Sequence, residues 1–278
     1  MNVLSIKNLC KSYESFNLNN VSFDIKKGTI MGFIGRNGAG KTTTLKSILN
    51  FVHPDSGEIL FFGKSFSENE FEIKQKLGFV SGGIDYYSKK KLRTITNVTR
   101  RFYKSWDEKA YDEYLKLFKL NDNKNADQLS AGMRVKYSLA LALSHNAELL
   151  ILDEPTSGLD PVSRDDLLDI FLTLCDKGIT ILFSTHITSD LEKCADTITY
   201  IKNGTIIAST DINTFTSKYK LVELTKEQLT DHIKPVLIGY KRSKSGYTAI
   251  INTEDSKKIN VKCSDADLES IMIHIEKE

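Results

Sequence analysis

A glycine-rich segment at residues 35–42, reading GRNGAGKT, constrains the fold more than any other part of this chain. It matches the phosphate-binding pattern G-x-x-x-x-G-K-[ST] at every position. An apolar run (residues 29–34) precedes it, as expected of a strand buried on both faces, and a helical pattern (residues 41–52) follows it. A strand, a glycine turn and a helix in this order direct backbone N–H groups and the positive end of a helix dipole at one anion. The segment therefore predicts an α/β fold that binds a nucleotide.

The residues of this segment have distinct expected roles around a triphosphate. Glycines permit the backbone conformation that points successive N–H groups inward at phosphate oxygens. Lys41 supplies a cation between the β- and γ-phosphates, and the Thr42 hydroxyl can bind Mg²⁺. The residues of this part of the chain that are expected to bind the nucleotide are Gly35, Arg36, Asn37, Gly38, Ala39, Gly40, Lys41, Thr42 and Thr43.

Two consecutive carboxylates end a second apolar run, residues 149–154, which reads LLILDE. Asp153, at the end of the predicted strand, is placed to hold Mg²⁺, in part through water. Glu154 would then face the γ-phosphate as general base or as the group that orients the attacking water. A single acid at the end of a strand is usually only a polar terminus, but two acids beside a phosphate loop predict catalysis.

Composition and charge exclude several classes of protein. Of the 278 residues, 40% are apolar and 27% are charged, which excludes a disordered or a fibrous chain. No apolar run reaches the about 18–20 residues that a transmembrane helix requires. A formal net charge of +2 gives no general argument for binding nucleic acid. The cysteines are scattered and include no CxxC pair, which indicates reduced thiols in a cytosolic protein: Cys10, Cys175, Cys194 and Cys263.

Strand-like and helix-like segments alternate along the first two hundred residues, which is typical of an α/β fold. A period of two predicts half-buried antiparallel strands at residues 3–9 and 21–25. The other predicted strands are residues 29–34, 58–62, 77–81, 149–153 and 179–184, and the predicted helices are residues 41–52, 161–176 and 188–194. Residues 88–144 are mainly helical in character. Asn203 and Gly204 predict a tight hairpin turn between residues 196–202 and 205–208.

The residues after about 220 form a predicted separate unit. It contains predicted strands at residues 236–240 and 247–252 and a final helix at residues 265–276, with Ser264 as its cap. The expected domains are therefore a nucleotide-binding domain (residues 1–215), with a helical subdomain at about residues 85–145, and a small C-terminal accessory domain (residues 220–278).

Three further motifs accompany the phosphate loop and the two acids in a fixed order. Residues 129–133 read LSAGM, residues 155–160 read PTSGLD, and residues 184–186 read STH. Together, over residues 1 to about 210, they resemble the ATP-binding cassette (ABC) transporter ATPases. The resemblance implies a P-loop core with an antiparallel β subdomain, a helical subdomain and a small α+β appendage. It also implies a signature motif formed by Leu129, Ser130, Ala131, Gly132 and Met133, a D-loop with Ser157 and Asp160, and a catalytic switch histidine, His186.

The resemblance implies that one ATP lies between two chains. Family members place the signature motif over the ATP that a second cassette holds, so a complete site needs a second ATPase chain, the same or homologous. Ser130 and the amides near Gly132 would then donate to the γ-phosphate from the opposite side. His186 resembles the group that links the γ-phosphate to Glu154. Tyr13 matches the aromatic residue that stacks on adenine, although a tyrosine that packs on its own domain is the alternative.

Two features leave open how the chain contacts its metal and its partner. Family members usually carry a glutamine after the strand that corresponds to residues 77–81, where this chain has Gly82, Gly83, Ile84 and Asp85. Gln75 lies before that strand and is expected to point elsewhere, and whether Asp85 replaces the glutamine stays open. Residues 88–104 hold seven Lys or Arg and no acid. They form either a solvated helix face or a surface turned toward the bilayer or a transmembrane partner.

The leading hypothesis is an ATP-hydrolysing subunit that dimerises around two ATP molecules with Mg²⁺ and powers export through separate transmembrane permease subunits. In its organisation, the chain resembles the ATPase subunits of bacterial exporters of the ABC-2 type. Such a subunit would lie at the cytoplasmic face of the membrane, held there by its partner, and no nucleic acid is expected to bind. The alternatives are a soluble ABC ATPase that regulates a non-transport process and a nucleotide-dependent binding protein that hydrolyses poorly.

Overall fold

The computed structural model describes residues 1–81, 87–259 and 261–278. Contacts divide the chain into two compact units, Met1–Ser209 and Thr210–Glu278. The division lies a few residues before the boundary expected from the sequence. Phe215 of helix α8 (Ile212–Thr216) explains part of this difference, because its ring packs edge-on against Tyr219 of the second unit at a centroid distance of 5.6 Å.

An antiparallel sheet in the first unit contains the two strands predicted from period-two alternation. In strand β2, buried positions recur at every second residue from Val21 to Ile25, and β1 and β2 pair Ile6 with Phe23. Both strands extend beyond the predicted ranges because their polar ends still complete backbone ladder bonds. The strand order is β2-β1-β4-β5, with β1 (Asn2–Ser12), β2 (Asn17–Lys26), β4 (Ser56–Phe61) and β5 (Lys64–Ser65).

A second, six-stranded sheet forms the centre of the first unit. Strand β3 is buried at all five positions and pairs in parallel with β8 on one side and with β9 on the other, as its continuous apolar sequence predicts. The order is β10-β9-β3-β8-β7-β6, with β3 (Ile30–Ile34), β6 (Leu77–Ser81), β7 (Leu149–Asp153), β8 (Thr180–Thr185), β9 (Thr197–Lys202) and β10 (Thr205–Asp211). The predicted turn joins β9 to β10 with positive φ at both Asn203 (48°) and Gly204 (76°).

Helices flank the sheets, and two of them differ from the sequence predictions. Helix α1 (Lys41–Ile48) ends before residue 52, because Asn50 takes a left-handed conformation and the Phe51 N–H closes back on the Lys46 carbonyl. Helix α2 (Phe66–Gln75) was not predicted. It buries only Phe66 and Ile73 and is irregular at Asn69, so its apolar spacing is too sparse to reveal a helix.

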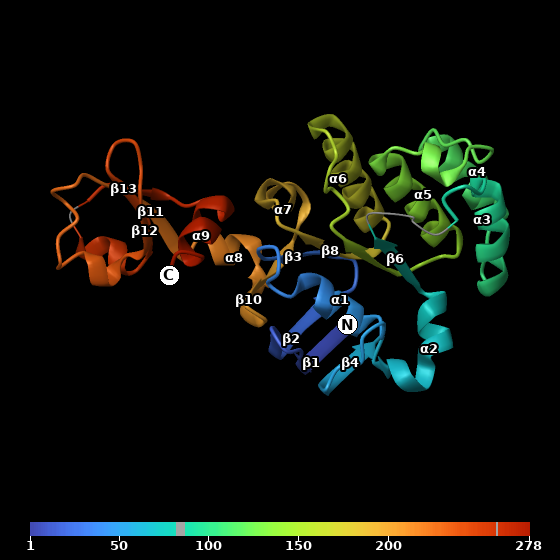
Figure 1. Ribbon diagram of the computed structural model, residues 1–278, viewed down its shortest axis with the longest axis horizontal. Coiled ribbons are helices and arrows are strands. Elements are labelled where there is room, and N and C mark those ends of the chain that lie inside the picture. The colour runs from blue at the N-terminus through green and yellow to red at the C-terminus, as the bar shows by residue number, and fades with distance from the viewer. Residues whose placement is uncertain (82–86, 260) are drawn as a thin grey trace. The chain divides into compact units, whose positions relative to one another are not determined.

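The predicted helical region contains several separate helices. They are α3 (Leu92–Thr99), the 3₁₀ helix η1 (Arg100–Phe102), α4 (Glu108–Leu117), the 3₁₀ helix η2 (Ala126–Gln128) and α5 (Ala131–Ser144). Figure 1 shows α3, α4 and α5 gathered beside β6. The buried Thr96 hydroxyl lies 2.8 Å from the hydroxyls of both Tyr111 and Tyr137, which ties the three helices together. Burial raises the pKa of Tyr111 to about 12, so this network stays neutral.

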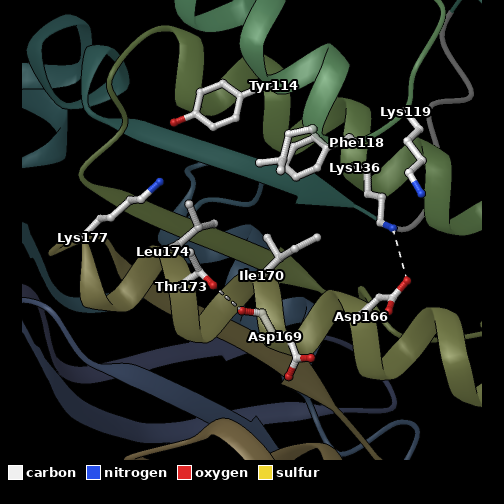
Figure 2. Close-up of a pocket in the computed structure, with 11 residues that line it drawn as sticks. Tyr114, Phe118, Lys119, Lys136, Asp166, Asp169, Ile170, Thr173, Leu174 and Lys177 are labelled. Atoms are coloured by element: carbon white, nitrogen blue, oxygen red, sulfur yellow. Dashed lines mark hydrogen bonds and ion pairs between the residues drawn. The ribbon is translucent and has the colours of Figure 1, made fainter.

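Two further helices follow strands of the central sheet, α6 (Pro161–Asp176) after β7 and α7 (Thr188–Cys194) after β8, both at the predicted positions. A cavity of about 390 Å³ separates the C-terminal half of α6 from α4. In Figure 2, Tyr114 of α4 and Phe118, the residue after α4, face Ile170 and Leu174 of α6 across this space, and Lys136 of α5 pairs with Asp166 at 3.9 Å. Packing between α4 and this half of α6 is therefore loose.

The second unit is a small α+β structure. Its sheet has the order β12-β13-β11-β14 and carries helix α9 against it. Its elements are α8, β11 (Tyr219–Leu224), the 3₁₀ helix η3 (Lys234–Val236), β12 (Ile238–Arg242), β13 (Tyr247–Asn252), the 3₁₀ helix η4 (Asp255–Lys258), β14 (Cys263–Asp265) and α9 (Leu268–Ile275).

The cap predicted for the final helix is wrong. Asp267 caps α9 by accepting a hydrogen bond of 2.7 Å from the Ser270 N–H, whereas Ser264 pairs with Leu221 as part of β14. The strand predicted at residues 236–240 also begins later, at Ile238, because η3 occupies the preceding residues. Among the described residues, no helix is both long enough and apolar enough to cross a membrane.

Candidate functional site

The glycine-rich segment forms the turn between β3 and α1 that its sequence predicts. Gly40 caps α1 with a φ of 113°, and the Thr44 N–H donates to its carbonyl at 2.9 Å. A Cβ atom at Gly40 would lie 2.8 Å from both Phe16 and Leu18, so this position requires glycine for its backbone conformation and for its space. The N-terminus of α1 therefore faces a site lined by backbone, which suits an anion.

Lys41 holds a buried positive charge at the centre of this turn. Its side chain is only 5% exposed, and Nζ donates to the carbonyls of Gly35 at 2.8 Å and Arg36 at 3.3 Å. The same ammonium lies 3.2 Å from Oε1 of Glu154. A buried ammonium needs such partners because an unpaired charge in the interior is very costly. The sequence motif and the acid at the end of β7 are thus in direct contact.

Asp153 and Thr42 present two oxygen atoms to one point beside the turn. The Thr42 hydroxyl donates to Asp153 Oδ1 at 3.3 Å, and the buried Ser184 hydroxyl donates to the same oxygen at 2.6 Å. Neighbouring cis ligands of an octahedral Mg²⁺ lie roughly 2.9 Å apart, given the ion's preferred ligand distances. The spacing and the hard oxygen chemistry of Thr42 and Asp153 therefore fit Mg²⁺. Among the described residues, no group of three or more His, Cys, Asp or Glu side chains is arranged to hold a metal ion.

Glu154 is held in place by the neighbouring strand. Parallel pairing of β7 with β8 puts Asp153 beside Ser184, and the Glu154 N–H donates to the Ser184 hydroxyl at 2.9 Å. Glu154 has a positive φ of 49°, which is uncommon for a residue with a side chain. Its Oε2 lies 2.9 Å from Nδ1 of His186. A chain of contacts therefore runs from Lys41 through Glu154 to His186.

Most of the expected nucleotide-binding and catalytic residues line one cavity of about 750 Å³ at the C-terminal end of the parallel strands. Gly35, Arg36, Ala39 and Asp153 are not among its described lining residues. The lining residues that the sequence analysis named are Tyr13, Asn37, Gly38, Gly40, Lys41, Thr42, Thr43, Glu154, Ser157 and His186. Ser15 and Phe16 also line it and were not foreseen, because no motif marks them. Tyr13 is 44% exposed, and its N–H closes a turn onto the Phe16 carbonyl at 2.8 Å. Two aromatic side chains, Tyr13 and Phe16, thus line the same cavity as the phosphate turn.

The signature and part of the D-loop do not line this cavity. Ser130 caps α5, where its hydroxyl accepts a hydrogen bond of 3.3 Å from the Met133 N–H, and its side chain is exposed. Leu129 is buried, and Ala131 and Met133 are half-buried. Gly132 lies beside Leu159, since a Cβ atom there would approach that side chain to 3.5 Å.

Asp160 caps α6 and accepts hydrogen bonds from the N–H groups of Val162 at 3.1 Å and Ser163 at 3.0 Å. Hydrogen bonds from Ser163 lower the pKa of Asp160 below its usual value. Asp160 therefore acts locally as a helix cap in this chain.

The region expected to hold a glutamine can be described only in part. Gly82, Gly83, Ile84 and Asp85, the last being the candidate substitute for the glutamine, lie outside the described residues. Gln75 points away from the nucleotide cavity, as expected. Its side chain donates to the Phe102 carbonyl at 2.9 Å and accepts from the Lys104 N–H at 2.8 Å. Gln75 therefore holds the segment after η1 and has a structural role.

Comparisons with known proteins connect this geometry to one group. A family model described as "ABC transporter" matches residues 18–157. The bacitracin transport ATP-binding protein BcrA of Bacillus licheniformis is 32% identical over 240 residues, covering 85% of this chain and 78% of that protein. The lantibiotic transport ATP-binding protein SrtF of Streptococcus pyogenes is 37% identical over 211 residues, covering 74% and 89%. A solved structure, described as an ATP binding subunit of an ABC transporter, gives a TM-score of 0.69 at 27% identity, covering 76% and 91%.

Proposed function

We infer that this chain, which belongs to the ABC transporter family, binds and hydrolyses ATP to power a transporter. The family match and the structural likeness confirm the resemblance and the α/β fold expected from the sequence. The observation that carries the mechanism is the set of contacts Lys41–Glu154 at 3.2 Å and Glu154–His186 at 2.9 Å. It joins the phosphate turn to a carboxylate and a histidine within one cavity.

The geometry supports a distinct role for each of these residues. The amides of the turn and Lys41 would bind the β- and γ-phosphates, with adenine at Tyr13 beside Phe16. Thr42 and Asp153 would hold Mg²⁺, which when bound neutralises part of the phosphate charge. Glu154 would accept the proton of the water that attacks the γ-phosphorus, while ADP departs. His186 would orient Glu154 through its Nδ1 and contact the γ-phosphate.

We propose that a second ATPase chain, the same or homologous, completes each site. Ser130 is exposed at the N-terminus of the 14-residue helix α5, where free N–H groups and the helix dipole favour an anion. The described lining of the chain's own nucleotide cavity does not include it. Ser130 is therefore available to contact a γ-phosphate held by another chain, together with the D-loop residues Ser157 and Asp160.

A charge reversal at Ser130 that preserves its helix cap tests this arrangement. In the Glu154→Gln background with Mg-ATP, we expect the chain to form a dimer in light scattering after size-exclusion chromatography. Adding Ser130→Asp should abolish that dimer, because a carboxylate would repel the γ-phosphate while it still caps α5 as well as serine does. Adding Ser130→Thr, which keeps the hydroxyl, is the matched control and should retain the dimer. A Ser130→Asp variant that dimerises as fully as its parent would contradict the proposed contact.

We further propose that transmembrane permease subunits dock on exposed aromatic rings near the end of β6. Phe51 and Phe79 contact each other edge-on at a centroid distance of 5.7 Å, and Phe51 is 61% exposed. Phe102 of η1 is also exposed. Exposed apolar rings at one place on a surface usually mark an interaction site. The positive charge of the basic segment at residues 88–104 is partly neutralised, since Arg93 pairs with Asp122 at 2.9 Å and Arg100 with Glu108 at 3.1 Å.

The double substitution Phe51→Ser/Phe79→Ser should separate the ATPase from the membrane. We expect at least a tenfold loss of chain that sediments with membranes containing the permease, with basal ATP hydrolysis unchanged. Leu117→Ser on α4, which removes another exposed apolar side chain, should change neither quantity. Equal sedimentation of the double variant and the wild type would place the docking surface elsewhere. A wild-type chain that never sediments with any membrane would favour a non-transport ABC ATPase.

Export is the proposed direction of transport, and the permease would hold the chain at the cytoplasmic face of the membrane, where ATP is available. Residues 1–215 would form the ATPase domain, with its helical subdomain at about residues 85–145, and residues 220–278 would form an accessory domain. No nucleic acid is expected to take part.

A further inference from the structure

A buried carboxylate, Asp190, links the two segments that carry Glu154 and His186. Asp190 lies on α7, four residues after His186, and its side chain is 1% exposed. It accepts a hydrogen bond of 2.6 Å from the hydroxyl of Thr156, which is fully buried two residues after Glu154. A short contact between two buried groups is protected from water, so it holds the backbone on both sides more firmly than an exposed contact would.

The backbone around Thr156 transmits this contact to Glu154. The Ser157 N–H donates to the Glu154 carbonyl at 3.1 Å, which closes a tight turn with Thr156 inside it. Glu154 itself has the left-handed backbone conformation described above, a state that persists only when its surroundings enforce it. A displacement of Thr156 would therefore rotate the Glu154 carboxylate relative to His186.

Asp190 also faces the first turns of α6. Its second oxygen, Oδ1, lies 3.9 Å from Nε of Arg164, and within the described residues both of these buried atoms lack a hydrogen-bond partner. Burial raises the pKa of Asp190, while Thr156 and then Arg164 act in the opposite direction. From its position on α7, the Asp190 carboxylate thus contacts both Thr156, which precedes the D-loop, and Arg164 of α6.

The contacts of α6 with α4 and with Lys193 constrain this helix more weakly than its contact with Asp190 does. The C-terminal half of the helix borders the cavity in Figure 2, so packing against α4 constrains it little. Lys193 of α7 pairs with Asp165 and with Asp169, the latter at 2.8 Å, but both carboxylates are exposed. Exposed ion pairs stabilise a structure weakly. Lys193 is therefore a suitable control for an α6–α7 contact that does not reach Glu154.

We propose that Asp190 is a positioning residue for ATP hydrolysis, which through Thr156 holds Glu154 at its working distance from His186. The inference rests on the proposed function, because it concerns the turnover of ATP. Asp190 is not among the described residues that line the nucleotide cavity. Its removal should therefore impair the chemical step and leave substrate binding intact.

The paired variants Thr156→Val and Thr156→Ser test the proposal. Valine keeps the shape of threonine but removes the hydroxyl, whereas serine keeps the hydroxyl. We expect Thr156→Val to lower kcat roughly 10- to 100-fold, since small displacements of a catalytic group have effects of this size. KM and ATP affinity should stay within threefold, and Thr156→Ser should recover most of kcat. Lys193→Gln should leave kcat within twofold of the wild type.

Two further measurements separate positioning from damage to the fold. If Thr156→Val does not fold, as judged by its Tm, Asp190→Asn takes its place, because asparagine keeps the volume but accepts the Thr156 hydrogen bond through a neutral and therefore weaker acceptor, and it loses the charge facing Arg164. It should lower kcat at least threefold at unchanged ATP affinity. In the Glu154→Gln background, Thr156→Val should lower the residual rate no further, because the group that it positions is already disabled.

Distinct outcomes overturn the inference and the proposed function. A folded Thr156→Val or Asp190→Asn variant with wild-type kcat would overturn the positioning role, as would a loss of ATP affinity equal to the loss of kcat. In either case the wild-type chain would still hydrolyse ATP. A wild-type chain that binds ATP but never releases phosphate would instead overturn the proposed hydrolysis.

Discussion

Replacing Glu154 by glutamine is expected to lower kcat for ATP hydrolysis by roughly 10²- to 10⁴-fold, the range over which a general base contributes. Glutamine keeps the size of the side chain but cannot take the proton of the attacking water. ATP binding should be retained or become tighter, because the substitution removes a negative charge that lies 3.2 Å from Lys41. Phosphate release measures the first effect, and titration calorimetry with ATP measures the second.

Glu148→Gln is the matched control for this substitution. Glu148 precedes β7 and forms exposed ion pairs with Lys27 at 3.5 Å and Lys76 at 3.1 Å. Its substitution by glutamine therefore makes the same chemical change outside the cavity. Its kcat should stay within twofold of the wild type. Phosphate release by Glu154→Gln at more than a tenth of the wild-type rate would refute the role of Glu154 as the base.

Lys41→Ala should weaken ATP binding by roughly 10- to 100-fold or more, given the strength of hydrogen bonds to charged groups. The substitution removes the cation at the centre of the turn and leaves the carbonyls of Gly35 and Arg36 without their buried donor. It also leaves Glu154 to repel the incoming phosphates. Equilibrium binding of a fluorescent ATP analogue measures the loss.

Lys46→Ala provides the comparison within the same helix. Lys46 lies in the last turn of α1 and is exposed, so its loss changes the net charge equally without reaching the cavity. Its ATP affinity should match the wild type. Unaltered affinity in Lys41→Ala would show that the glycine turn does not bind the triphosphate.

The local parts of the site could be predicted from the sequence because their geometry depends on neighbouring residues. The apolar β3, the glycine turn and the first turn of α1 follow one another in the chain, so their sequence specifies their contacts. Asp153 and Glu154 end a buried strand, and parallel pairing with β8 sets Asp153 beside Ser184. Family resemblance supplied the expected roles of His186 and Ser130, which spacing alone does not give.

Features that depend on distant packing could not be predicted. Asp190 occurs in a short helix with charged neighbours and reads as an exposed acid, yet the packing of α7 buries it beside Thr156. Phe16 follows a strand end without a motif, and only the fold brings it next to Gly40. Ser264 looked like a helix cap because pairing with β11 is a long-range event that sequence spacing does not reveal. Helix α2 lacked a sufficient apolar stripe.

The left-handed backbone conformation of Glu154 lowers the stability of the fold at a position whose side chain is needed for ATP turnover. A residue with a side chain loses roughly 1–2 kcal/mol in that conformation, and glycine avoids the loss. Evolving this protein in the laboratory for heat resistance alone would therefore favour glycine or asparagine at residue 154. Such stabilised variants would have an unstrained backbone at residue 154 but would lack the carboxylate that hydrolysis requires.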